Sequence, residues 1–192
     1  MANGTCRTIC WIPTWNSSRE GIGLEHLLLT QNKADSVVLA IDDKRGPFRL
    51  VYRLYWNEEW QLRSAEFSVA TNGSSASLSL KTDGHGHWQD GQGHRLVELD
   101  ECMDIDIWPT PFTNSFPIRR QPMSLGERCL FRMAWVFGSD LTVRPQPQAY
   151  TRVAEKLYLF ENLDGSSFQA ELQVDEDNIV LDSPELFRRV KA

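Results

Sequence analysis

Apolar and polar residues alternate along much of this chain in short segments, and turn signals separate these segments. Phe48–Trp56 reads FRLVYRLYW, and Gln61–Ala70 and Ser75–Lys81 alternate in the same way. A repeat of two residues places successive side chains on opposite faces of a strand, whereas a helix repeats every 3.6 residues. Asn72–Gly73, between the second and third of these segments, is a hairpin signal. The pattern therefore predicts antiparallel strands and argues against a helical bundle.

Further short apolar alternations follow up to the end of the chain, which favours a mainly β protein. Such a protein must protect the edges of its sheet, and curling around a cavity is one way to do so. We expect a single curled antiparallel sheet, either a β-roll or a half-open barrel. Ser183 at an N-cap position and Pro184 at the first helical position also predict a short C-terminal helix that ends near Val190.

Length and charge narrow the class of protein. The 192 residues predict one domain over residues 1–192. The net charge of −6 argues against nucleic acid as a partner. No apolar run approaches the roughly 20 residues of a membrane span, and residues 1–10 lack the apolar core of a secretory signal. We therefore expect a cytoplasmic protein, while the sequence leaves its oligomeric state open.

Cysteine and histidine give little support for a metal site. The four cysteines form no CxxC pair, as is typical of free thiols in a reducing compartment. His85 and His87 are close in sequence and would share one face of a strand, but Gly84 and Gly86 make this segment turn-like. No metal-ligand motif supports a metal site in this segment over an exposed loop. We predict neither a metal nor another cofactor.

The most distinctive segment is Asp104–Arg120, which reads DIDIWPTPFTNSFPIRR. Asp104 and Asp106 are two apart on a predicted strand, so their carboxylates share a face. Three prolines predict an extended or turning loop after this strand, and such a loop would fix polar side chains at little entropic cost. The charged residues could form a structural ion network or a site for a polar head group. The polar candidates in this segment are Asp104, Asp106, Thr113, Asn114, Arg119 and Arg120.

Aromatic residues are numerous, with seven Trp and nine Phe. Many lie on predicted strand faces or at strand ends. They could be ordinary core residues, or they could line the wall of a site for an amphiphile, which needs apolar walls and a few fixed polar groups. The candidate wall residues are Trp56, Trp60, Trp88 and Tyr150.

Several segments together resemble the putative glycolipid-binding family, a bacterial family long of unknown function. The likeness covers about residues 8–190, and its central proline-rich motif is specific. The segments that carry it are Gly23–Glu25, Tyr52 with Trp60, Cys102–Asp106, Thr110–Asn114, Pro117–Arg120, Gln148–Tyr150, Val174–Asp175 and Val180–Arg189. The resemblance implies a curled β domain similar to the half-open barrel of bacterial lipoprotein carriers, with a bound glycolipid.

Three functions remain open at this point. The first is non-catalytic binding of a glycolipid or another amphiphile, with Glu25 added to the polar candidates above. The second is a small hydrolase that uses Asp104 and Asp106, or Glu25, as acid and base, because glycoside chemistry needs paired carboxyl groups. The third is a structural or interaction module in which the central motif only fixes the sheet.

Overall fold

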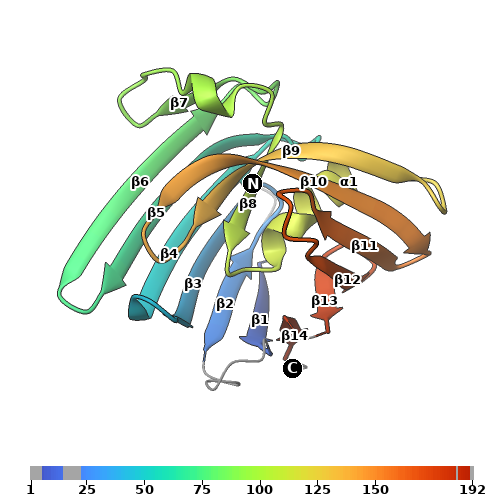
Figure 1. Cartoon of the computed structure of the whole chain (residues 1–192), viewed down its shortest axis with the longest axis horizontal. Coiled ribbons are helices and arrows are strands. Elements are labelled where there is room, and N and C mark those ends of the chain that lie inside the picture. The colour runs from blue at the N-terminus through green and yellow to red at the C-terminus, as the bar shows by residue number, and fades with distance from the viewer. Residues whose placement is uncertain (1–5, 15–22, 185, 191–192) are drawn as a thin grey trace.

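The computed structural model describes residues 6–14, 23–184 and 186–190. Within these residues fourteen strands form one continuous, curled sheet that does not close (Figure 1). Every neighbouring pair is antiparallel except β8 and β9, which run parallel. The strands are β1 Arg7–Pro13, β2 Leu24–Leu29, β3 Lys33–Asp42, β4 Gly46–Trp56, β5 Leu62–Thr71, β6 Ser74–Thr82, β7 Trp88–Asp90, β8 Asp104–Trp108, β9 Arg128–Phe137, β10 Thr142–Ala154, β11 Leu157–Asn162, β12 Gln169–Val174, β13 Val180–Ser183 and β14 Phe187–Arg189.

Helices contribute little to the described part of the chain. They are two 3₁₀ turns, η1 Val97–Leu99 and η2 Phe112–Asn114, and the short helix α1 Ser115–Arg120. None of the helices in the described ranges has the length and apolar character needed to cross a membrane.

The alternating segments form the predicted strands. In β4 the even-numbered residues Leu50, Tyr52 and Leu54 are fully buried, whereas Arg49 and Arg53 are exposed. A strand with one face in the core and the other in solvent produces this pattern. The mainly β, curled and antiparallel fold expected from the sequence is therefore confirmed.

The predicted hairpin between β5 and β6 is also present. Gly73 occupies the turn with φ of 87°, a conformation that glycine adopts without the steric penalty of a Cβ atom.

Among the described strands, the first and the last, β1 and β14, pair in the interior of the sheet rather than at its edges. The strand order is β7-β6-β5-β4-β3-β2-β1-β14-β13-β12-β11-β10-β9-β8. Two meanders therefore meet where β1 pairs with β14, through Trp11 opposite Arg189, Ile12 opposite Arg188 and Pro13 opposite Phe187. We call this pairing the β1–β14 seam. The free edges belong to β7 and β8.

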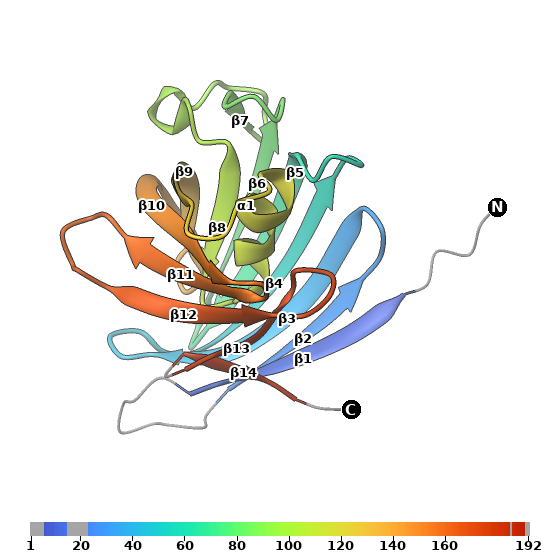
Figure 2. The same cartoon turned by 90° about the vertical axis from the view of Figure 1, so that its right-hand side faces the viewer.

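The curl encloses β8 and α1, which lie inside it in both views (Figures 1 and 2). One face of β8 contributes Ile105 and Ile107 to a large apolar core that also contains Leu50 and Phe116. This core attaches β8, β9 and α1 to the N-terminal strands.

A second, smaller core lies within the C-terminal half of the sheet. It contains Met133 of β9, Tyr150 of β10, Leu172 of β12 and Val180 of β13, and Ile118 of α1 joins it. Because side chains alternate along a strand, Asp104 and Asp106 lie on the face of β8 opposite Ile105 and Ile107. The C-terminal strands thus curl over the acidic face of β8 (Figure 2).

The predicted C-terminal helix is wrong. Ser183 ends β13, the chain turns with a hydrogen bond from Leu186 N–H to the Ser183 carbonyl oxygen at 2.9 Å, and Phe187–Arg189 forms β14. The helix-start signal of Ser183 and Pro184 reflects only the local sequence. Pairing with β1 buries Phe187 and satisfies the backbone along the strand, so tertiary pairing overrides the helical signal.

The central proline-rich motif, Asp104–Arg120, also differs from the predicted extended or turning loop, because it contains η2 and α1. Pro117 lies in the first turn of α1, where the missing N–H would have no partner within the helix. Proline is therefore compatible with this helix. A different proline, Pro109, directly follows the last residue of β8.

Candidate functional site

A cavity of about 240 Å³, partly open to solvent, lies in the C-terminal half of the curl. Its walls come from β8 to β14 and from the segment between β8 and α1. The lining residues are Asp106, Ile107, Trp108, Thr110, Asn114, Trp135, Gln148, Phe160, Asn162, Phe168, Ala170, Leu172, Ser183, Leu186 and Phe187. The wall is thus mostly aromatic and aliphatic, with a minority of polar groups.

Asp106 is the acidic group of this cavity. One of its carboxylate oxygens accepts a hydrogen bond from Thr113 Oγ1 at 3.1 Å and the other accepts one from Gln148 Nε2 at 2.6 Å. Burial raises the pKa of Asp106, and these hydrogen bonds oppose the rise. Thr113 Oγ1 also accepts the backbone N–H of Ile107 at 3.1 Å, which ties η2 to β8.

Tyr150 and Asn114 continue the polar network beside Asp106. The Tyr150 hydroxyl donates to Asn114 Oδ1 at 2.7 Å, and Asn114 Nδ2 donates to the Pro111 carbonyl oxygen at 3.1 Å. Burial raises the pKa of Tyr150 well above its ordinary value, with a further contribution from Asp106 and Asp104, so the hydroxyl keeps its proton. Asn114 lines the cavity and Tyr150 holds it in place.

Asp104 is fully buried and does not line the cavity. Arg120 binds it through two nitrogens, with Nη2 at 2.6 Å from Oδ2 and Nε at 3.0 Å from Oδ1. The guanidinium group also lies over the ring of Phe131. The two acids that share a face of β8 therefore have different surroundings: Asp104 has an arginine partner, and Asp106 has neutral donors.

Sequence reasoning missed the aromatic residues that line the cavity. Phe168, directly before β12, is 40% exposed, and Trp135 and Phe160 are half-buried. Trp108 was within reach of the sequence, because it belongs to the proline-rich motif. The others come from strands whose place around the cavity depends on pairing between distant segments. The aromatic lining residues are Trp108, Trp135, Phe160, Phe168 and Phe187.

Three of the aromatic candidates lie elsewhere. Trp56 is in the large core, where its ring centroid lies 4.9 Å from that of Trp60 and 5.4 Å from that of Phe116. Trp88 is fully buried and donates its indole N–H to the Cys102 carbonyl oxygen at 2.7 Å. These rings hold α1 and the segment before β8 against the N-terminal strands.

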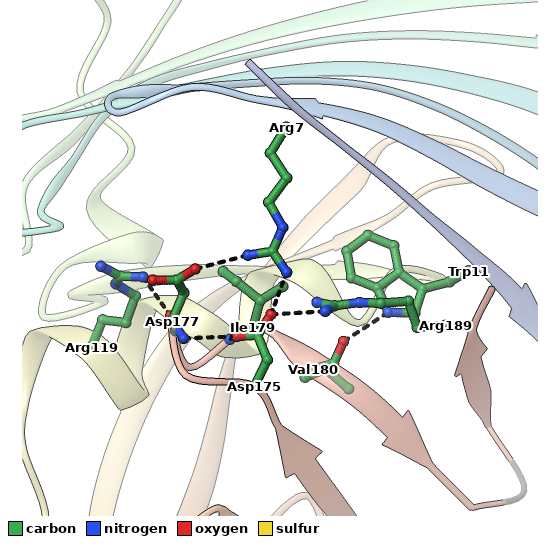
Figure 3. A network of polar contacts seen from close by, with 8 residues as sticks. All are labelled: Arg7, Trp11, Arg119, Asp175, Asp177, Ile179, Val180 and Arg189. Carbon is green, nitrogen blue, oxygen red and sulfur yellow. Dashed lines mark hydrogen bonds and ion pairs between the residues drawn. The ribbon is translucent and has the colours of Figure 1, made fainter. Parts of the chain in front are cut away.

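Arg119 lies in a separate groove of about 580 Å³, and its guanidinium group is 4.0 Å from the ring centroid of Trp60. It donates to the carbonyl oxygen of Asp177. Arg7 of β1 pairs with Asp177 at 2.8 Å and with Asp175 at 2.6 Å (Figure 3).

The same network reaches the last strand. Arg189 of β14 binds Asp175 at 2.7 Å and lies over the ring of Trp11 (Figure 3). The turn between β12 and β13 is therefore joined to α1, β1 and β14 by charged groups. Arg119 is part of this connection and not of the cavity wall.

Glu25 forms a third buried polar group, on the inner face of β2. Its Oε1 accepts hydrogen bonds from the Tyr52 hydroxyl at 2.5 Å and from Ser36 Oγ at 2.8 Å. Burial, with no cation beside the carboxyl group in the described residues, raises the pKa of Glu25 to about 7. The Tyr52 hydroxyl is also 3.3 Å from Thr110 Oγ1, so this network reaches the cavity wall from behind.

Ser183 is the lining residue with an unsatisfied polar atom. Its side chain is fully buried, and its Oγ has no hydrogen-bond partner among the described residues. A buried hydroxyl without a partner costs free energy, so this atom is available to a group that enters the cavity.

The histidine loops do not form a metal site in the described part of the chain. His87 contacts Asp83 at 2.7 Å and His94 contacts Asp90 at 3.0 Å, both in exposed turns. No group of three or more His, Cys, Asp or Glu residues within the described ranges is arranged to hold a metal ion.

Comparison with known proteins agrees with the resemblance seen in the sequence. The sequence model of the family described as "Putative glycolipid-binding" matches residues 13–189. The crystal structure of a DUF1089 family protein from Pseudomonas aeruginosa is similar, with a TM-score of 0.87 and 45% sequence identity over 92% of this chain and 95% of that chain. No curated protein matches this sequence. The family match spans nearly the whole curled sheet, and the chain therefore belongs to the putative glycolipid-binding family.

Proposed function

We propose that this protein binds an amphiphile, a lipid with a polar head group such as a sugar, in the cavity between β8 and β14, without catalysing a reaction. The observation that carries the proposal is a cavity with aromatic and aliphatic walls and a few fixed polar groups. Asp106, Asn114 and Gln148 hold defined positions in this wall, and the Ser183 hydroxyl lacks a partner. Sites for small amphiphiles combine these features.

The size of the cavity limits what it can enclose. Its volume of about 240 Å³ is below the roughly 300–1,000 Å³ of most small-molecule sites. A head group and the first part of a chain would fit, while the rest of a lipid tail would extend past Phe168, which is exposed. The name of the family supports a glycolipid as the ligand, since a sugar offers several hydroxyl groups to carboxylate and amide side chains.

The arrangement of the carboxyl groups favours binding over hydrolysis. A glycoside hydrolase needs two carboxyl groups that flank the bond to be cleaved. Of the two acids on β8, Asp106 lines the cavity, whereas Asp104 is buried against Arg120. Glu25 is hydrogen bonded within a separate network behind Thr110. The described residues therefore offer one carboxylate to a ligand in this cavity.

The direct test is to ask whether a lipid occupies the cavity. Native mass spectrometry of the purified protein should detect a bound lipid, and octyl β-D-glucoside should raise the melting temperature, because a ligand that binds only the folded state stabilises it. Ala170→Trp, which fills the cavity, should abolish the shift. Glu171→Trp, on the outer face of the same strand, should keep it.

If no lipid co-purifies and neither the native protein nor Glu171→Trp responds to the glucoside, binding is refuted. The central motif would then only fix the sheet, and the protein would be a structural or interaction module, the third function that the sequence leaves open.

A further inference from the structure

The described residues of the cavity wall include an acidic side chain but no basic one. Among the described residues that line the cavity, Asp106 is the only ionisable one. A ligand with an anionic head would meet this carboxylate without a lysine or arginine on the wall to balance it. Like charges at close range in a partly buried site repel strongly, because the local dielectric is low.

Asp104 provides an internal comparison, since it lies two residues away on the same face of β8. Its carboxylate is neutralised by Arg120 at 2.6 Å. The partners of Asp106 are the Thr113 hydroxyl and the Gln148 amide, and none of the ion pairs in the described part of the chain includes Asp106. A buried or half-buried carboxylate is stabilised by a positive partner. For Asp106 that partner is missing from the wall.

The rings beside Asp106 also suit a positive group. Trp108 and Phe187 pack edge to face at 6.0 Å between centroids, and Phe160 and Phe168 do so at 6.1 Å. All four line the cavity. An ammonium group within about 6 Å of such rings is attracted by their quadrupoles. The protein's net charge of −6 adds a weak general attraction for cations.

We propose that the head group bound in this cavity carries a protonated amine, which pairs with Asp106. The inference rests on the proposed function, because it specifies the ligand of the same site. The amine could belong to a simple alkylamine or to an amino sugar, and both present the same ammonium group to the carboxylate.

The test compares probes that share one octyl chain, titrated into the native protein by calorimetry. Octylamine should bind about tenfold or more tightly than 1-octanol, as expected for a charge-assisted hydrogen bond in place of a neutral one. Octanoate should show no measurable binding. A tighter complex with octyl 2-amino-2-deoxy-β-D-glucoside than with octylamine would identify an amino sugar as the source of the amine.

Two variants locate the effect. Asp106→Asn keeps the size of the side chain and should bind octylamine and 1-octanol with equal affinity. Glu171→Gln removes one negative charge from the exposed face of β12 and should keep the preference for octylamine. The comparison of probes in the native protein needs no variant, so a poorly folded Asp106→Asn does not affect it.

The outcomes separate the two proposals. If octyl β-D-glucoside and 1-octanol bind as well as octylamine, or octanoate binds too, the amine is ruled out while amphiphile binding stands. If none of the octyl compounds binds, both proposals fail.

Discussion

At the scale of single residues, the protein holds two fully enclosed acids by different means. Asp104 is neutralised by a bidentate arginine, whereas Glu25 is surrounded by hydroxyl groups. Burial raises the pKa of both carboxyl groups. The Arg120 guanidinium group opposes this rise at Asp104, whereas only hydrogen bonds from hydroxyl groups oppose it at Glu25. The two sites should therefore respond differently to mutation and to pH.

Asp104→Asn should destabilise the protein by about 3–5 kcal/mol, because it leaves the Arg120 guanidinium group largely buried without a counter-charge. The double variant Asp104→Asn/Arg120→Met should lose less stability than the sum of the losses in the two single variants. Urea unfolding measures these free energies. Glu161→Gln, which breaks the more exposed pair with Arg128, serves as the control and should cost about 0–1 kcal/mol. If Asp104→Asn and Glu161→Gln lowered the free energy of unfolding equally, the pair of Asp104 and Arg120 would not act as a buried ion pair.

Glu25 should make stability depend on pH. Its pKa of about 7 in the folded protein exceeds its ordinary value of 4.5, so the folded state holds the proton more tightly. The resulting stability is fully present below pH 4.5 and is lost as the pH rises through 7. Glu25→Gln mimics the protonated side chain. Relative to the native protein, its free energy of unfolding should therefore increase by about 2–3 kcal/mol between pH 5 and pH 8.

Urea unfolding at these two pH values tests this prediction. Glu171→Gln, on an exposed strand face, serves as the control. Its free energy of unfolding should differ from that of the native protein by the same amount at both pH values. A Glu25→Gln difference that is independent of pH would show that Glu25 ionises at its ordinary pKa.

At the scale of elements, α1 is too short to be stable alone and depends on its aromatic contacts. Phe116 is fully buried, and its ring centroid lies 5.4 Å from Trp56, 5.4 Å from Trp60 and 5.9 Å from Phe112. These rings attach the helix to the N-terminal strands. The helix in turn carries Arg120, the partner of Asp104.

Phe116→Ala should destabilise the protein by about 3–5 kcal/mol, through lost burial and the remaining void. Near-ultraviolet circular dichroism should report the changed packing around Trp56 and Trp60. Urea unfolding measures the loss in the free energy of unfolding. Leu125→Ala, at a side chain that is 71% exposed, should change stability by less than about 0.5 kcal/mol. A small effect at Phe116 would mean that α1 is held mainly by its polar contacts.

Elements with one buried and one exposed face were predictable from the sequence, and elements defined by distant pairing were not. The alternation in Phe48–Trp56 identified β4, and Asn72–Gly73 identified the hairpin turn between β5 and β6. The Ser183–Pro184 signal failed because β14 depends on β1, which is distant in sequence. Of the polar lining residues, Asp106 and Asn114 belong to the proline-rich motif, whereas Ser183 does not. The rest of the wall could not be predicted from that motif, because Trp135 and Phe160 face the cavity only after β9 to β12 have paired.

At the scale of the whole molecule, the β1–β14 seam joins two meanders through a short ladder. The backbone N–H of Val190 donates to the Cys10 carbonyl oxygen at 2.9 Å, next to the pair Trp11 and Arg189. Cys10 and Val190 therefore face each other across the seam, and opposed residues of an antiparallel pair lie within disulfide range.

Val190→Cys should form a disulfide with Cys10 under oxidising conditions and stabilise the protein by about 2–5 kcal/mol, since the bond closes a very long loop. Thermal unfolding with and without a reductant measures the gain. The variant Cys10→Ser/Val190→Cys cannot form this bond and should show no dependence on the reductant. If the single variant also shows none, the two strands do not have this register.

The seam also sets the order in which the molecule can be assembled during synthesis. One side of β1 has no partner until residue 189 has left the ribosome, which at roughly 5–20 residues per second is a delay of many seconds. The sheet is thus completed by its most distant contact, a type of contact that slows folding. A circular permutant that joins the two ends and opens the β11–β12 turn would turn this contact into a local hairpin, and it should fold faster into the same sheet.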